Sequence, residues 1–139
     1  MPDTIFDRIV RGEAPAHRVW EDDGFLAFLD TRPSRPGHVL LIPKEVPDDG
    51  GDDVFALPPD VYAALWERAR RLAGPIREAM GARRVGAVVE GFGVAHAHVH
   101  LIPLDEVGDL APQAEEPVSH GELAAVASRI RAAVEAAGV

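Results

Sequence analysis

The sequence predicts a single α+β domain, and three observations support this class of fold. Short apolar runs typical of strands, separated by Gly, Pro and Asp residues, occupy the first third of the chain. Helical periodicity then follows, and after it come two further strand-like runs. The chain of 139 residues is 47% hydrophobic, enough to bury one core without disulfides or metals, and it contains no evident repeat or linker. We therefore expect one domain over residues 1–139.

The N-terminal part is predicted to begin with a short helix. Thr4 is placed to cap this helix, whose apolar residues include Phe6 and Ile9 and which ends at Gly12. Three strands that resemble an antiparallel meander are expected next, at residues 17–21, 25–30 and 37–43. The acidic, Gly-rich segment 45–53 has no apolar periodicity, which favours a surface loop.

A long helix is expected to start near Pro58 and to place Leu65, Leu72 and Ile76 at helical spacing. Pro75 should kink this helix or split off its last turn, because proline cannot donate the helical hydrogen bond. The two remaining strands are expected at residues 85–90 and 96–103. A capping-box pattern at Ser119 predicts a C-terminal helix over about residues 119–137.

Composition limits the classes of function. A net charge of −9 argues against nucleic acids and anionic membranes as partners, since both need a basic surface. No apolar run approaches the roughly 20 residues of a membrane helix, and charges stand where a signal peptide would be apolar, so we expect a cytoplasmic protein. The absence of Cys removes thiolate nucleophiles and thiolate zinc sites. A small anionic ligand in a local pocket is compatible with this composition.

Three of the six histidines stand on alternate positions in the stretch HAHVHLIP, as His96, His98 and His100. Alternate side chains of a strand share one face, so the three rings are expected in succession about 7 Å apart. The apolar residues between them then face a core, which the long helix can cover. Three unrelated buried histidines would each need a separate polar partner, so the regular spacing favours a functional row.

A metal site is the main alternative for this row. Zinc or iron can bind three imidazoles, but the ligand atoms must then converge within about 2.1 Å of the ion. Residues along one straight strand spread apart instead, and no carboxylate lies inside the motif. We therefore expect neither a metal nor another cofactor. The alternative predicts bound zinc or iron and loss of activity with a chelator.

The stretch HAHVHLI resembles the signature of the histidine-triad (HIT) family of nucleotide-binding hydrolases and transferases. The runs TIFDRIVRGEAPAHRVWEDDGFLAFLD and DTRPSRPGHVLLIPK also resemble the Hint-like and Fhit-like branches of this family. The resemblance covers residues 4 to about 104, and the remainder is a C-terminal extension. It implies a HIT-like fold, in which an antiparallel sheet of about five strands has the long helix on one face.

The resemblance also implies a mechanism. His98 would attack the α-phosphorus of a purine nucleotide conjugate and form a covalent nucleotidyl-histidine intermediate, which water then hydrolyses. The backbone carbonyl of His96 can accept the Nδ1 proton of His98 and so direct Nε2 at phosphorus. His100 and His38 would donate hydrogen bonds to phosphate oxygens. The conjugate could be a phosphoramidate or a dinucleoside polyphosphate.

Further positions correspond to the nucleotide-binding residues of the family. Asp30 matches the carboxylate that holds the ribose hydroxyls, although a turn carboxylate that caps backbone amides would look the same. The base pocket is matched by Phe6, Phe28, Thr31 and Leu40. For Phe28 and Leu40 an ordinary core position is the alternative. His17 and His120 match no functional residue.

The chain also departs from the family pattern. Phe92 and Gly93 stand where a Gln and a Ser are expected before the triad, which leaves the acid that protonates the leaving group unassigned. Glu90 lies in the same segment and would repel a phosphate unless it points away or acts as an acid. The Cys residues that bind a structural zinc in some members are replaced by Thr4 and Asp7.

Two hypotheses of different class follow. One is a nucleotide phosphoester or phosphoramidate hydrolase that works through His98; the other is a nucleotide-binding regulatory protein with weak or lost catalysis. The resemblance further implies a homodimer formed through the long helix and an adjacent strand. Its apolar contacts would come from Leu57, Tyr62, Leu65 and Trp66, unless these residues only cover the sheet of their own monomer.

Overall fold

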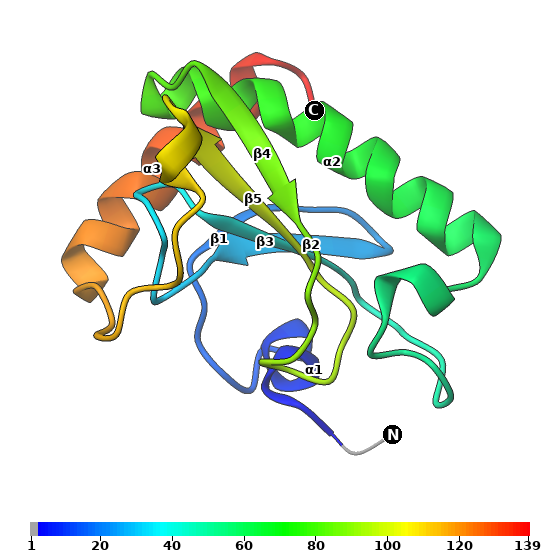
Figure 1. Ribbon diagram of the computed structural model, residues 1–139. Helices are drawn as coiled ribbons and strands as arrows, with labels where there is room; N and C mark the ends of the chain where they lie inside the picture. The colour runs from blue at the N-terminus through cyan, green and yellow to red at the C-terminus, as the bar shows by residue number, and fades with distance from the viewer. Residues whose placement is uncertain (1–2) are drawn as a thin grey trace.

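The computed structural model describes residues 3–139 and consists of one antiparallel sheet with helices on both faces (Figure 1). The five strands lie in the order β1-β2-β3-β5-β4. They are β1 (Arg18–Glu21), β2 (Phe25–Leu29), β3 (Val39–Pro43), β4 (Arg84–Val88) and β5 (Val99–Leu104). The helices are α1 (Ile5–Val10), α2 (Pro59–Met80) and α3 (His120–Ala136), with short 3-10 helices η1 (Val54–Ala56) and η2 (Val107–Asp109). The predicted α+β class is confirmed.

The larger core lies between the sheet and the two long helices. Leu41 and Val99 project from β3 and β5 into a cluster that contains Leu65 and Leu72 of α2 and Ile130 of α3. In Figure 1, α2 and α3 lie on one side of the sheet and the short helix α1 lies on the other. Within residues 3–139, none of the helices combines the length and the apolar character needed to span a membrane.

A smaller core lies on the opposite face of the sheet, beneath α1. Phe6 and Ile9 of α1 pack there against Leu26, Phe28 and other strand residues. Side chains of β2 alternate between the two faces, so Phe28 belongs to this cluster while its neighbours Ala27 and Leu29 belong to the larger one. The polar residues considered below gather beside this smaller core.

Thr4 caps α1 as expected, and Asp7 completes a capping box with it. Pro75 does not split off the last turn, because α2 continues through this residue to Met80. Pro75 is one of the buried residues of this helix, together with Leu72 and Ile76.

The last expected strand begins later than predicted. It starts at Val99, so His96 and His98 precede it in an irregular segment. Alternation nevertheless persists in this segment, because Ala97 joins the larger core while the rings of His96 and His98 both contact Phe6 on the other face. The expectation that the three rings share one face is therefore confirmed.

Candidate active site

A pocket of about 310 Å³ opens on the face of the sheet that carries α1. Seven of the nine residues predicted from the sequence line it: Phe6, Phe28, Asp30, Thr31, Leu40, His98 and His100. The other two do not line this pocket. His38 lies behind His100 and borders a neighbouring cavity, and His96 is fully buried. The sequence thus predicted seven of the 17 residues that line the pocket.

Backbone hydrogen bonding fixes the tautomer of His98. Its Nδ1 lies 2.7 Å from the carbonyl oxygen of His96. A carbonyl oxygen only accepts, so Nδ1 must carry the proton, and in the neutral ring Nε2 then holds a free electron pair. The ring is held at its edge by Phe6, with 5.2 Å between ring centroids and an interplanar angle of 90°. His98 thus offers the pocket an oriented, unprotonated nitrogen.

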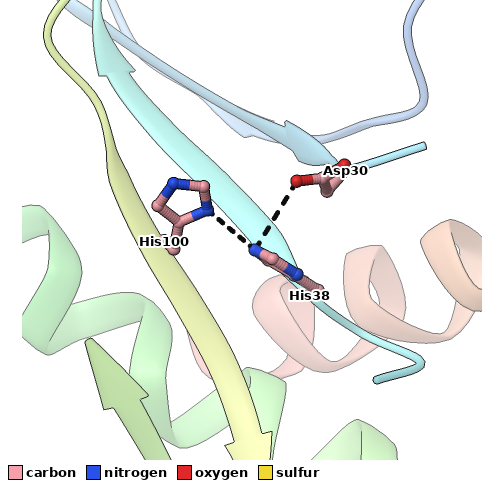
Figure 2. A group of neighbouring side chains, drawn as sticks. All are labelled: Asp30, His38 and His100. Carbon is pink, nitrogen blue, oxygen red and sulfur yellow. Dashed lines mark hydrogen bonds and ion pairs between the residues drawn. The ribbon is translucent and has the colours of Figure 1, made fainter. Parts of the chain in front are cut away.

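His38 and His100 form a second oriented pair (Figure 2). The backbone N–H of Ser34 donates to Nδ1 of His38 over 3.0 Å, so this nitrogen is the acceptor and Nε2 carries the proton. Nε2 of His38 in turn lies 2.9 Å from Nδ1 of His100 and donates to it. His100 therefore carries its own proton on Nε2, a buried atom without a hydrogen-bond partner among residues 3–139. The row of hydrogen bonds through Ser34, His38 and His100 thus ends at the Nε2–H of His100, which is free to donate.

Burial keeps this pair neutral. It lowers the pKa of His38 to about 4, against an opposing effect of the Asp30 carboxylate. The pKa of His100 is also lowered, first by burial and then by the neighbouring His98 ring. Both rings are consequently uncharged at neutral pH. His100 can donate a hydrogen bond to an anion without the cost of a buried positive charge.

The carboxylate of Asp30 is held at the mouth of the pocket by two donors. One oxygen accepts the backbone N–H of Arg32 over 2.9 Å, and the other accepts the side-chain amide of Gln113. The second oxygen also lies 3.7 Å from Nε2 of His38, as Figure 2 shows. An oriented carboxylate of this kind can accept hydrogen bonds from two adjacent hydroxyl groups.

Asp30, His38 and His100 are also the only group within residues 3–139 whose ligating atoms lie close enough to hold a metal ion, all within 4.8 Å of one another. The three histidines of the alternating row do not form such a group. In the arrangement described, the 2.9 Å hydrogen bond between His38 and His100 uses both of the nitrogens concerned. An ion could bind here only if this hydrogen bond were broken.

Gln113 is the clearest residue that sequence reasoning missed. It lies in a Pro-containing segment that follows the histidine row. No sequence pattern indicates a contact between this segment and Asp30. Three hydrogen bonds bring this segment beside the β2–β3 turn: from Ser34 Oγ to the Ala111 carbonyl (2.8 Å), from Ala114 N–H to the Arg32 carbonyl (3.3 Å), and from Val118 N–H to the Thr31 carbonyl (2.9 Å).

The segment before the triad borders the same pocket. Glu90 is exposed at its rim, close to His98 and His100. Its carboxylate accepts the backbone N–H of Phe92 over 3.4 Å, and the Phe92 side chain is 92% exposed. The amide and hydroxyl that the sequence lacks at residues 92 and 93 are thus replaced by an exposed aromatic ring and a glycine. His17 and His120 pair with each other on the surface, 3.2 Å apart.

Comparison with known proteins gives a consistent result. The model of the HIT domain family matches residues 11–107. An uncharacterized HIT-like protein of Methanocaldococcus jannaschii is 48% identical over 104 residues, which are 71% of this chain and 77% of the relative. The adenylylsulfatase HINT3 of Arabidopsis thaliana is 34% identical over 110 residues, or 75% of this chain and 53% of the relative. The chain thus spans about half the length of that relative.

Solved structures with the same fold cover nearly the whole chain. A HIT-like protein from Bartonella henselae, described as involved in cell-cycle regulation, superimposes with a TM-score of 0.82 at 27% identity, over 94% of this chain and 96% of that one. A zinc-bound histidine-triad family protein from Mycobacterium smegmatis gives a TM-score of 0.79 at 29% identity, over 95% and 93% of the two chains.

Proposed function

The chain belongs to the HIT domain family, and from that premise we propose that it hydrolyses nucleotide conjugates at the α-phosphate, with His98 as the nucleophile. The observation that carries the proposal is the opposite protonation of two neighbouring rings in one pocket. Hydrogen bonding leaves Nε2 of His98 unprotonated and Nε2 of His100 protonated, and the ring centroids are 5.0 Å apart. A nucleophile and a hydrogen-bond donor for phosphate thus lie side by side.

In the proposed reaction, Nε2 of His98 forms a bond to the α-phosphorus while the bond from phosphorus to the leaving group breaks. The electron pair of that bond departs with the leaving group. The N–H of His100 donates to a phosphate oxygen as negative charge develops on it. Water then attacks the same phosphorus, the nitrogen–phosphorus bond breaks, and the nucleoside monophosphate is released with His98 restored.

The remaining pocket residues suit a nucleoside. We assign the ribose hydroxyls to Asp30, whose carboxylate is buried and fixed by Arg32 and Gln113. The base would lie against Phe6, Phe28, Thr31 and Leu40, which line the same pocket. Phe6 and Phe28 contact each other edge to face at 5.4 Å between centroids, so they form a preformed apolar wall. A purine base is the one that the resemblance to the HIT family implies.

The leaving group is proposed to be one that departs without protonation. Residues 92 and 93 supply neither an amide nor a hydroxyl side chain that could form a hydrogen bond to a departing group, and we assign no acid role to Glu90. Sulfate and polyphosphate groups leave readily as anions, whereas the amine of a phosphoramidate needs a proton. The name of the Arabidopsis relative, an adenylylsulfatase, is in agreement with this preference.

The test is to incubate the protein separately with adenylyl sulfate, a diadenosine polyphosphate and adenosine phosphoramidate. We expect release of AMP, fastest from adenylyl sulfate, and a covalent adenylyl adduct on the intact protein by mass spectrometry. His98→Ala should abolish both, while His17→Ala, a surface histidine, should change neither. Tight AMP binding without release from any conjugate would instead identify a nucleotide-binding regulatory protein.

We also propose that the protein forms a homodimer through α2. Of the four residues expected at the contact, Leu57 and Leu65 are buried in the core of their own monomer and do not offer a surface. Tyr62 and Trp66 lie one helical turn apart with ring centroids separated by 6.3 Å, and Phe55 adds an aromatic ring that is 68% exposed. This cluster of three aromatic residues is the contact surface that we propose.

A further inference from the structure

His96 is fully buried, and its Nδ1 has no hydrogen-bond partner among residues 3–139. The other ring nitrogen, Nε2, lies 2.7 Å from the carbonyl oxygen of Pro43. Because a carbonyl oxygen only accepts, Nε2 must carry a proton. In a neutral ring Nδ1 would then present a bare electron pair inside the protein. Such an unsatisfied buried acceptor is uncommon and calls for a physical explanation.

The polar atom that faces this nitrogen is itself an acceptor. Oδ1 of Asp7 lies 3.5 Å from Nδ1 of His96, and the Asp7 side chain is only 27% exposed. The other oxygen, Oδ2, accepts hydrogen bonds from the backbone N–H of Thr4 over 2.8 Å and from its hydroxyl over 3.1 Å. The oxygens of a carboxylate only accept hydrogen bonds. A lone pair and a carboxylate would therefore repel each other unless a proton lies between them.

Nearby cations are engaged with other carboxylates. Arg11 and Lys44 border the same surface cavity as Asp7. Arg11 pairs with Asp3 and Glu13, each at 2.8 Å, and Lys44 pairs with Glu21 at 2.9 Å. Within residues 3–139, the ring nitrogen of His96 is the one basic nitrogen that lies within 4 Å of the Asp7 carboxylate.

We propose that His96 carries a proton on both ring nitrogens and forms a buried imidazolium–carboxylate pair with Asp7, which makes Asp7 a positioning residue for His98. The connection runs through the backbone, because the carbonyl of His96 accepts the Nδ1 proton of His98. Thr4 fixes the Asp7 carboxylate at the start of α1. Asp7 and the Pro43 carbonyl then fix the orientation of the His96 ring. The backbone carbonyl of His96 in turn fixes the tautomer of His98. The nucleophile is thereby linked to the N-terminal helix.

A metal ion shared by the two side chains would be the other way to remove the repulsion. The residues do not fit a zinc site, because Asp7 and His96 have no third His, Asp or Glu ligand within reach in the described part of the chain. The hydroxyl of Thr4 is engaged with Asp7 as a cap. In the proposed pair of Asp7 and His96, a proton therefore satisfies the buried Nδ1 of His96 in place of a metal ion.

The first experiment needs no variant and does not depend on the proposed reaction. Long-range ¹H–¹⁵N correlation spectra of the ¹⁵N-labelled full chain, recorded near neutral pH, report which nitrogens of each histidine carry protons. We expect His96 to show both nitrogens protonated. A neutral His96 ring with Nδ1 bare would overturn the proposal, as would one equivalent of metal per chain that is lost in Asp7→Asn.

The second experiment separates positioning from stability. Asp7→Asn keeps the size of the side chain and an oxygen for the Thr4 cap but removes the charge, so His96 should become neutral in the same spectra. We expect kcat for nucleotide hydrolysis to fall about tenfold with KM nearly unchanged, because the nucleophile is displaced while the nucleoside pocket is intact. The matched control is Asp3→Asn, on the surface of the same segment. An unchanged kcat in Asp7→Asn, with wild-type turnover present, would refute the positioning role.

Discussion

The side-chain amide of Gln113 donates a hydrogen bond to the carboxylate of Asp30, a residue 83 positions earlier in the chain. The bond joins the segment after β5 to the end of β2, at the mouth of the pocket. It leaves the Asp30 carboxylate with further acceptor capacity, so a ribose could bind while Gln113 stays in place. Gln113 thus fixes the orientation of the group that we assign to the ribose.

Gln113→Ala should therefore weaken nucleotide binding more than it slows the reaction. A net hydrogen bond contributes about 1 kcal/mol, and this one is partly buried, so we expect KM to rise about fivefold with kcat within a factor of about two. Steady-state kinetics would measure both values. Glu115→Ala, an exposed neighbour, is the control. A fall in kcat at constant KM would show that Gln113 acts on the reacting phosphate instead.

The directions of the hydrogen bonds around the pocket also predict the tautomers of three histidines. His38 and His100 should be neutral with the proton on Nε2, because the Ser34 N–H donates to one ring and that ring donates to the other. His98 should carry its proton on Nδ1, opposite to both. Nitrogen-15 spectra of the histidine rings distinguish these forms directly. A proton on Nε2 of His98 would leave the proposed nucleophile without its electron pair and would contradict the proposed function.

Much of the fold and seven of the residues that line the pocket could be predicted because the relevant patterns are local. Alternation along HAHVHLIP placed the rings on one face, and it held even where the strand itself had not begun, since Ala97 and Val99 must still reach the larger core. The caps at Thr4 and Ser119 likewise depend on neighbours within one helical turn.

What could not be predicted depends on contacts between distant segments. The tautomer of His38 is set by the backbone N–H of Ser34. Every residue except proline carries such a group, so no sequence pattern indicates this contact. Gln113 reaches Asp30 only because hydrogen bonds bring the segment after β5 beside the β2–β3 turn. The continuation of α2 through Pro75, a buried residue of this helix, likewise has no local sequence signal.

The lowered pKa values of the paired histidines predict how stability changes with pH. An unfolded histidine binds a proton below about pH 6.5, whereas folded His38 does so only below about 4. Between these values the unfolded state binds more protons, so the free energy of unfolding should fall as pH decreases through this window. The pKa of His100 is lowered in the same direction and adds to the effect.

Urea denaturation at several pH values between about 6.5 and 5 would test this dependence, above the range in which the carboxylates titrate. The slope should be smaller in His38→Gln, which has no titrating ring at this buried position, and unchanged in His17→Gln on the surface. Equal slopes in the wild type and in His38→Gln would show that burial of this ring does not govern the acid sensitivity.

The aromatic cluster Phe55, Tyr62 and Trp66 provides the test of the dimer. Because Phe55 is 68% exposed, its replacement should cost little stability in the monomer but remove apolar area from a contact between two copies. Sedimentation velocity at micromolar concentration should give a dimer for the wild type and mainly a monomer for Phe55→Glu, which leaves the half-buried Tyr62 and Trp66 in place. Ile5→Glu, which is also an exposed apolar position but lies on α1 across the sheet, should remain dimeric. A wild type that stays monomeric in this concentration range would contradict the pairing, in which the same surface of both copies forms the contact.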